Sequence, residues 1–336
     1  MKALWKTLLV LAVIIGALGA AALAERTGIG AIEAAHQPSG QFVNVKGGRL
    51  HLVALGERDK PVIVLLHGSS ANLEDMRLAL APSLSAQYHV VLVDRPGHGW
   101  SDRPDGVADA SPLRQAQLIH EALERLGISK AMIVAHSWAA AVALSYALAY
   151  QQSVTGLVLL APLAYPRPPS VAWHDNVISA LLAQSARIAD SPVFGAFFSR
   201  TLLYPLGELL LRAAVRGAFA PQQPVPDYIE QAAAELLLRP DAFICNGQDL
   251  SSIDDFLAKQ EQNYRKISVP VSIIAGDADT VVSTDANARR LATALPHASL
   301  TVLPSVGHMV QFAAPDRIVD AAAAILRARS GPSAPK

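Results

Sequence analysis

The sequence predicts an α/β fold in which a mostly parallel, doubly wound sheet carries an inserted helical cap and an N-terminal helix directed to a membrane. Three observations lead to this prediction. Strand and helix patterns alternate from residue 62 to 160, about a hundred residues without a strand pattern follow, and the alternation returns at residue 271. A length of 336 residues suits one large domain with such an insertion.

Composition and charge exclude several classes of protein. The apolar fraction of 51% includes 59 alanines, which argues against a protein with many membrane spans. Twenty-eight basic side chains balance 28 acidic ones and form no basic run of five, so a nucleic-acid partner is not expected. The single cysteine, Cys245, cannot close an intramolecular disulfide, and the sequence contains no histidine–carboxylate cluster or phosphate loop. We therefore expect no metal ion and no other cofactor.

The first 24 residues are expected to engage a membrane. Lys2 and Lys6 precede an uncharged run over 7–24, which forms roughly 27 Å of helix and approaches the hydrocarbon thickness of a bilayer. We interpret the run as a retained signal anchor, and the alternative is a signal peptide cleaved after Ala24 to give a secreted or periplasmic protein. In both cases the lysines stay cytoplasmic and the rest of the chain crosses the membrane. Residues 25–40 are expected to form a linker.

The elements of the core follow from hydrophobic periodicity. Two alternating runs on either side of Gly47-Gly48 predict an antiparallel hairpin at the edge of the sheet. Short continuous aliphatic runs predict strands buried on both faces, and apolar residues spaced three or four apart predict the helices. The expected strands are 41–46, 50–55, 62–66, 89–93, 131–135, 154–160, 271–275 and 299–303, and the expected helices are 73–84, 112–126, 137–150, 288–295 and 315–329.

The core is thus expected in two parts, 41–163 and 267–329, with the helical cap, 164–266, between them. Nine prolines separate the helical patches of the cap. The tail, 330–336, is rich in proline and serine and is expected to be disordered.

Candidate catalytic residues follow three of the predicted strands. Ser137 stands between a strand and a helix, the context of a nucleophile elbow, although a serine at a helix start is commonly an N-cap. Asp277 and Asp279 follow the next-to-last strand, and His308 follows the last one. The carboxyl ends of parallel strands meet at one edge of a sheet, where open α/β sheets bind ligands. A serine, an acid and a histidine in this chain order therefore predict a catalytic site.

Together these motifs resemble those of the α/β-hydrolase superfamily, and the resemblance covers about 41–163 and 267–329. It implies the fold of that family, with the insertion placed where such enzymes carry a helical cap. The segments that carry it are His67-Gly68, Asp94-Arg95-Pro96-Gly97-His98-Gly99-x-Ser101, the elbow at Ser137, Gly276-x-x-Asp279 and Gly307-His308.

The resemblance also implies roles for individual residues. Ser137 would be the nucleophile, His308 the base and then the acid, and Asp279 the carboxylate that orients His308. Asp279 is preferred to Asp277 because the acid of this family generally stands three residues after the glycine. The oxyanion hole would consist of the backbone N–H groups of Ser69 and Trp138.

Other polar residues of these motifs are expected to be structural. His136 lies next to the nucleophile and is not expected to be a base. His67 and His98 are expected to brace loops, and Asp94 and Arg95 to have structural roles.

Three details of the motifs bear on the reaction. Ala135 and Ala139 stand where the usual elbow has glycines. Prolyl iminopeptidases often show a Ser-Trp pair, but their Gly-Gly-Pro loop is absent here. A serine at the elbow argues against the haloalkane dehalogenases and epoxide hydrolases of this fold, which use aspartate there.

The expected activity is that of a carboxylesterase-like or lipase-like serine hydrolase that cleaves an ester through an acyl-enzyme. An amide or a carbon–carbon bond is the less favoured target. The alternatives are an acyltransferase, a prolyl-iminopeptidase-like peptidase and, from another class, a noncatalytic ligand-binding protein. Apolar residues over 194–198 and 202–211 predict a pocket for a small to medium apolar acyl substrate. The same residues could instead pack on the core or touch a bilayer.

Overall fold

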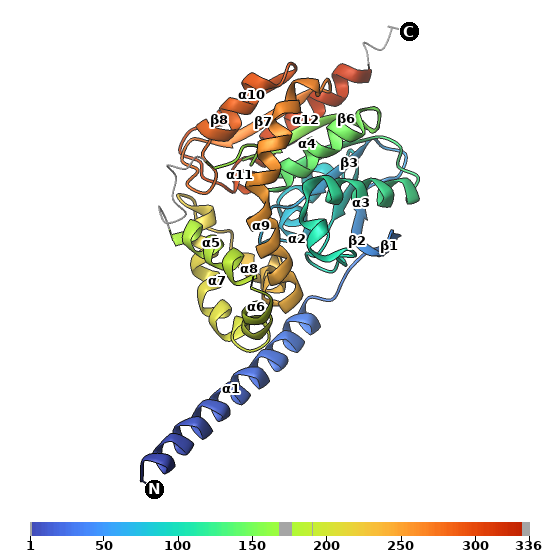
Figure 1. Cartoon of the computed structure of the whole chain (residues 1–336). Helices are drawn as coiled ribbons and strands as arrows, with labels where there is room; N and C mark the ends of the chain where they lie inside the picture. Colours follow the sequence, from blue (N-terminus) through green and yellow to red (C-terminus); the bar gives the residue numbers. More distant parts are fainter. Residues whose placement is uncertain (1, 168–176, 190, 331–336) are drawn as a thin grey trace, which may run out of the picture.

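The computed structural model describes residues 2–167, 177–189 and 191–330, and it confirms the predicted α/β fold. Eight strands form one sheet in the order β1-β2-β4-β3-β5-β6-β7-β8 (Figure 1). β2 pairs antiparallel with β1 and β4, and all other neighbours are parallel. The strands are β1 (Gln41–Val45), β2 (Gly48–Leu55), β3 (Val62–Leu66), β4 (His89–Val93), β5 (Ala131–His136), β6 (Val154–Leu160), β7 (Val271–Gly276) and β8 (Ala298–Leu303).

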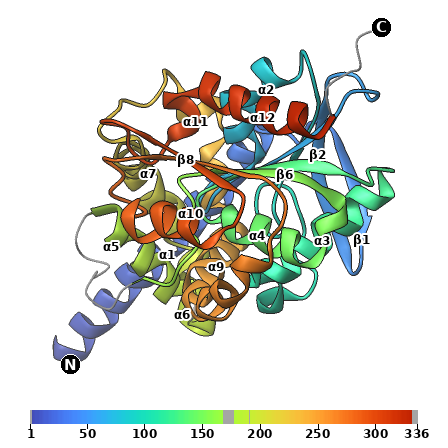
Figure 2. The same cartoon turned by 90° about the horizontal axis from the view of Figure 1, so that it is seen from above.

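Helices cover both faces of the sheet (Figure 2). α2 (Leu73–Leu84) and α12 (Pro315–Ser330) lie on one face, and α3 (Pro112–Arg125), α4 (Ala139–Ala149) and α10 (Arg290–Ala294) lie on the other. Along β3, Val64 and Leu66 pack with α3 and α4, whereas Ile63 and Leu65 pack with α2 and α12. The aliphatic runs are continuous because both sides of these strands are buried.

Most of the expected elements are observed within a few residues of their predicted bounds. The helix expected over 288–295 starts earlier, because a π-helical turn, Asp285–Arg289, leads into α10. Strand β2 begins at Gly48, since the hairpin turns at Gly47, whose φ of +89° favours glycine. Shorter elements of the core are η1 (Gly106–Ala110), η2 (Gln151–Ser153) and α11 (Val310–Ala313). The tail lies outside the described residues, apart from Ser330, which ends α12.

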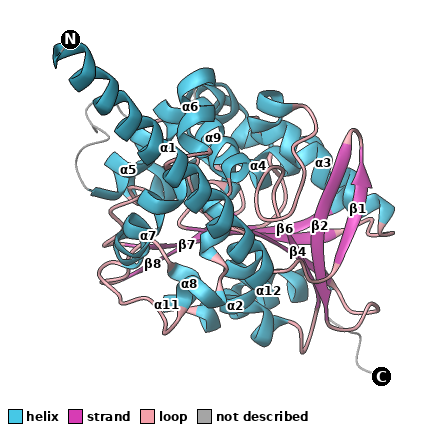
Figure 3. Ribbon diagram, turned by 90° about the horizontal axis from the view of Figure 1, so that it is seen from below, coloured by secondary structure: helices cyan, strands magenta, loops and turns pink. Residues whose placement is uncertain are grey.

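The insertion between β6 and β7 forms a helical layer next to the sheet. No strand occurs among its described residues. Figure 3 shows α5, α6 and α7 gathered with the N-terminal helix, away from β1 and β2. The helices of this cap are α5 (Val177–Ala189), α6 (Pro192–Ser199), α7 (Leu203–Phe219), α8 (Tyr228–Gln231), η3 (Ala234–Leu238), α9 (Pro240–Gln260) and η4 (Glu261–Lys266).

The N-terminal helix α1 (Lys2–Ala35) is continuous over 34 residues. It is long and apolar enough to cross a bilayer, and most of its large apolar side chains before Glu25 are exposed. From Glu25 onward the helix contacts the cap, and Ile32 is buried there. The first part of the segment expected as a linker, 25–35, is therefore helical, because packing against the cap stabilises it.

Candidate active site

Ser137 lies on the sharp turn between β5 and α4. Its φ of +54° is a left-handed conformation that costs energy for a residue other than glycine and is held by the surrounding structure. The Ser137 N–H donates to the carbonyl oxygen of Leu160 at 2.8 Å, which ties the turn to β6. Trp138 rather than Ser137 is the N-cap residue of α4, so the serine is not used as a helix cap. Ala135 and Ala139 are fully buried, and the turn accommodates both methyl groups.

Ser137, His308 and Asp279 form one hydrogen-bonded chain. His308 Nε2 lies 2.9 Å from Ser137 Oγ, and His308 Nδ1 lies 2.8 Å from Asp279 Oδ2. The other oxygen of Asp279 accepts the N–H groups of Val281 and Val282 at 2.8 and 2.9 Å, which fixes the carboxylate. The imidazole is therefore held with one nitrogen toward an acid and the other toward a serine hydroxyl, an arrangement that can withdraw the hydroxyl proton.

Asp277 is used differently from Asp279. Its Oδ1 accepts the N–H of Ser305 at 2.6 Å and so connects the loops after β7 and β8. It has no contact with His308. Of the two aspartates in this loop, Asp279 is the one placed to orient the histidine.

The backbone N–H groups of Ser69 and Trp138 donate to no other described residue. Trp138 stands at the amino end of α4, where N–H groups and the helix dipole favour negative charge. Ser69 lines the same cavity as Ser137. The two groups can therefore stabilise an oxyanion that forms beside Ser137.

A cavity of about 280 Å³ lies between the core and the cap. Ser137 and His308 line it from the core side. The cap side is mostly apolar and includes Leu182, Ile188, Phe198, Leu206, Leu211 and Phe243. Such a pocket suits an apolar ligand with its reacting group at the polar end. Among the described residues, no group of histidine, cysteine and acidic side chains could hold a metal ion.

Comparison with known proteins identifies the family. A model of the alpha/beta hydrolase fold matches residues 61–315. The chain belongs to this family. Epoxide hydrolase A of Mycobacterium tuberculosis is 25% identical over 325 residues, covering 84% of this chain and 96% of that protein. Epoxide hydrolase 3 of Xenopus tropicalis is 32% identical over 133 residues, covering 40% of this chain and 35% of that protein.

Solved structures share the α/β-hydrolase fold with this chain. An alpha/beta hydrolase fold protein from Burkholderia ambifaria is 26% identical, with a TM-score of 0.68 over 87% of this chain and all of that one. A membrane phospholipase A, described as a bacterial virulence factor, is 21% identical, with a TM-score of 0.62 over 97% of this chain and 98% of that one. The predicted membership of the superfamily is therefore confirmed.

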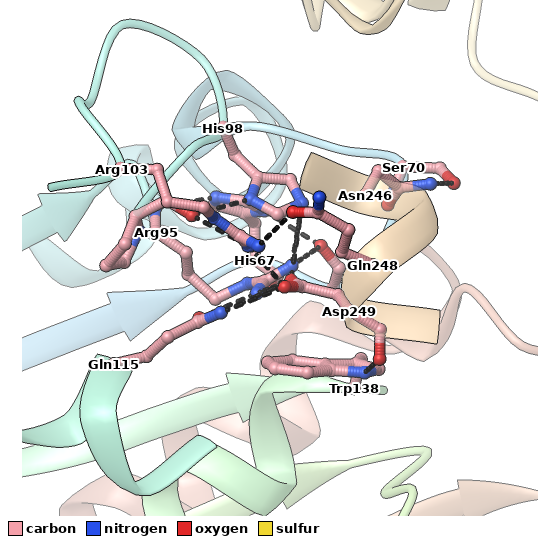
Figure 4. Close-up of polar contacts among 12 residues, drawn as sticks. His67, Ser70, Arg95, His98, Arg103, Gln115, Trp138, Asn246, Gln248 and Asp249 are labelled. Carbon is pink, nitrogen blue, oxygen red and sulfur yellow. Dashed lines mark hydrogen bonds and ion pairs between the residues drawn. The ribbon is translucent and has the colours of Figure 1, made fainter. Parts of the chain in front are cut away.

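In this α/β hydrolase, a buried ionic network connects the cap to the loop that carries Ser69 (Figure 4). Asp249 of α9 accepts hydrogen bonds from Arg95 at 2.8 Å, from Gln115 at 3.2 Å and from Arg103. Arg95 in turn donates to the carbonyl oxygens of His67 and Gly68 at 3.0 and 3.1 Å. Burial raises the pKa of Asp249 and lowers that of Arg95, and their pairing offsets this cost.

Helix α9 also contacts the two segments expected to form the oxyanion hole. It contacts Trp138 directly, and it contacts Ser70, the neighbour of Ser69. Asn246 Oδ1 accepts the N–H of Ser70 at 2.6 Å, and its amide group donates to the Ser70 hydroxyl at 3.1 Å. The Trp138 indole donates to the backbone oxygen of Asp249 at 3.2 Å and lies under the Arg95 guanidinium. Neither Asn246 nor Asp249 was predicted from the sequence. Their only signal was two polar residues three apart on the mostly apolar buried face of a cap helix.

A second buried acid, Asp75, lies at the cavity wall and was also missed. Tyr228 of the cap donates to its Oδ1 at 2.7 Å, and Gln311 donates to its Oδ2 at 3.1 Å. Burial raises the pKa of Asp75 to about 6. Asp75 therefore links the core to the cap beside the loop of His308.

The remaining motif residues support loops. His136 contacts the backbone oxygen of His308 at 3.1 Å, and burial lowers its pKa to about 3, so it is neutral beneath the site. His67 Nε2 accepts the Arg95 N–H at 3.0 Å, and Asp94 accepts the N–H groups of Leu73 and Trp100 at 2.8 and 2.9 Å.

Proposed function

We propose that this protein is a serine hydrolase that cleaves esters with an apolar acyl group. The observation that carries the proposal is the hydrogen-bonded chain from Ser137 through His308 to Asp279 at the wall of an apolar cavity. In the proposed roles Ser137 is the nucleophile, His308 the general base and acid, and Asp279 the orienting carboxylate.

The reaction begins when Ser137 Oγ attacks the ester carbonyl carbon and His308 Nε2 takes the hydroxyl proton. The carbonyl oxygen becomes an oxyanion, which accepts hydrogen bonds from the backbone N–H groups of Ser69 and Trp138. When the C–O bond breaks, His308 returns the proton to the leaving alcohol. A water molecule then attacks the acyl-enzyme with His308 as its base, and the carboxylic acid and free Ser137 are released.

The serine favours acyl chemistry over the chemistry named for the epoxide hydrolase relatives. A carboxylate nucleophile that opens an epoxide or displaces a halide forms an ester, which water can cleave at its carbonyl. A serine in the same attack would form an ether, which has no carbonyl for water to attack. Ser137 therefore supports hydrolysis of an acyl substrate, in which the intermediate is itself an ester.

The membrane association is a further part of the proposal. We propose that α1 is a retained anchor and that the hydrolase domain lies outside the cytoplasm, because Lys2 and Lys6 precede the apolar run. A solved structure that is similar over 97% of this chain is described as a membrane phospholipase A, which is in keeping with membrane association. A phosphatase or lactamase reporter fused after Lys336 would be active outside the cytoplasm, and N-terminal sequencing would reveal any cleavage after Ala24.

The activity is tested by labelling with a fluorophosphonate and by turnover of p-nitrophenyl esters. The parent protein is expected to be labelled at Ser137 and to release p-nitrophenol, and Ser137→Ala is expected to do neither. Ser145→Ala is a matched control, because Ser145 is equally buried but lies within α4. Labelling of the Ser137→Ala protein, or an adduct at Ser69 or Ser70, would contradict the assignment.

A further inference from the structure

Two cap helices expose six large apolar side chains beside the N-terminal helix. Val193, Phe194 and Phe197 of α6 are 84%, 51% and 41% exposed, and Leu206, Leu209 and Leu210 of α7 are 45%, 76% and 44% exposed. We call these six residues the α6–α7 face. Large apolar side chains exposed on two helices that contact each other mark a site of contact with a membrane or a protein.

The cap is fixed to α1 at this place. Glu25 of α1 accepts the N–H of Tyr204, at the start of α7, at 2.8 Å. Gly28 lies against the Tyr204 ring so closely that a Cβ there would be 2.3 Å from it. Further along α1, Ile32 is buried with Leu203. These contacts join the start of α7 to α1.

These contacts begin where the exposed apolar part of α1 ends. Residues 5–24 correspond to roughly 30 Å of helix, the hydrocarbon thickness of a bilayer. Figure 1 shows α1 leaving the molecule on the cap side, close to α6 and α7. If residues 5–24 span the bilayer, Glu25 and the start of α7 lie at its surface, and the α6–α7 face lies beside them.

The catalytic cavity reaches the same face. Leu206 and Leu210 are both partly exposed and both line the cavity that holds Ser137. An acyl chain that leaves the bilayer can therefore remain against apolar side chains until it reaches the serine. Arg212 and Arg216, exposed one turn apart further along α7, can contact lipid phosphates.

We propose that the α6–α7 face rests in the interface of a lipid bilayer and that membrane lipids deliver their acyl chains to the cavity between Leu206 and Leu210. The occupant is a bilayer rather than a second copy, because the adjoining part of α1 is itself suited to lipid. The proposed docking is argued from the α6–α7 face and from α1 alone, whereas the delivery of substrate rests on the proposed ester hydrolysis.

Docking is tested with the full chain in vesicles of phosphatidylethanolamine and phosphatidylglycerol. A fluorophore placed through Leu209→Cys is expected to be quenched by lipids that carry a spin label near the headgroup. The same fluorophore placed through Val107→Cys is not, because Val107 is 65% exposed on η1 of the core. The parent protein carries the buried Cys245 as its single cysteine, and the same labelling reaction on it measures the background fluorescence from that thiol.

Substrate delivery is tested with a triple variant, Val193→Asp, Phe194→Asp and Leu209→Asp, none of which lines the cavity. We expect hydrolysis of vesicle phospholipid to fall about tenfold or more, because three carboxylates oppose insertion into the interface. Turnover of soluble p-nitrophenyl butyrate is expected to stay within about twofold of the parent. Val107→Asp, the matched control, is expected to change neither activity.

The outcomes separate the two proposals. Quenching at position 209 without hydrolysis of any ester would overturn the proposed function and leave the docking intact. Ester hydrolysis without quenching at 209, or a fluorophore shielded there by a second copy, would overturn the docking. Equal loss of lipid and soluble-ester hydrolysis in the triple variant would overturn the delivery route.

Discussion

The two halves of the candidate active site are built in different ways. On the core side, Ser137, His308 and Asp279 are held by hydrogen bonds shorter than 3 Å to one another and to backbone groups. On the cap side, the cavity is lined mostly by aliphatic and aromatic side chains held by packing. Hydrogen bonds fix atoms within narrow limits of distance and angle, whereas apolar packing fixes volume and shape. In the proposed function, the core half is therefore suited to chemistry and the cap half to selection of the acyl group.

Helix α9 is the exception to this division. It belongs to the cap, yet Asn246 and Asp249 hold the loop of Ser69 and the indole of Trp138. Tyr228, also of the cap, holds Asp75 of the core. Substitutions within each half and at these contacts distinguish two independent halves from two that are joined through α9 and Tyr228.

The largest effect is expected within the core half. Asp279→Asn is expected to lower kcat by about 10⁴, because the amide favours the wrong tautomer of His308. Asp277→Asn is the matched control and is expected to lower kcat much less, since the Asp277 carboxylate accepts the N–H of Ser305 and not a hydrogen bond from His308. Initial rates on a p-nitrophenyl ester measure both. A larger loss for Asp277→Asn would mean that this aspartate is the orienting acid.

The contact between Asp75 and the cap is expected to give a pH-dependent stability. Burial raises the pKa of Asp75 to about 6, so the folded protein holds this proton more tightly than the unfolded chain does. The stabilising contribution of the protonated group is complete below about pH 4 and is lost as the pH rises through 6. We therefore expect the free energy of unfolding of the parent protein to fall by about 2–3 kcal/mol between pH 4 and 7 as Asp75 loses its proton. The Asp75→Asn variant has no carboxyl group to titrate at this position and should not show this fall.

Denaturant unfolding of parent and variant across this pH range measures the difference. Asp59→Asn provides the control, because Asp59 is exposed and is expected to leave the pH dependence unchanged. Parallel pH profiles for the parent and Asp75→Asn would show that Asp75 does not titrate in this range.

A smaller effect is expected where α9 joins the two halves. Asn246→Ala removes the acceptor of the Ser70 N–H and should let the loop of Ser69 move. We expect kcat to fall about tenfold with little change in KM, because in the proposed mechanism the N–H of Ser69 acts on charge that develops in the transition state. Lys259→Ala, at an exposed position of the same helix, should have no effect. A change confined to KM would assign Asn246 to substrate binding instead.

The smallest effect is expected within the cap half. Specificity for p-nitrophenyl esters should rise from acetate toward butyrate or hexanoate, with about fourfold per methylene that the pocket buries. Leu238 lines the cavity, and Leu238→Ala enlarges the cavity. This variant should therefore prefer a longer acyl chain than the parent protein does. A strict preference for acetate in both proteins, or faster cleavage of a charged acyl group, would show that the cap selects by size or polarity.

Much of the fold and the order of the candidate site residues could be predicted from the sequence. The aliphatic runs of β3, β4 and β6 indicate burial on both faces, because a strand in a parallel sheet is covered from both sides. Ser137, Asp279 and His308 could be proposed because each follows a strand directly, so the topology brings them to one edge. Each of these signals is local, because it depends only on a strand and the few residues that follow it.

Only the tertiary structure revealed how the cap is joined to the rest of the molecule. Asn246 contacts Ser70 across 176 residues of chain, and Tyr228 contacts Asp75 across 153. Glu25 contacts Tyr204 across 179, which makes part of the expected linker helical. Periodicity reports which face of a helix is buried and not what lies against it. The sequence alone therefore determined the elements and the candidate reacting groups, and the packing of distant segments decided which polar residues support them.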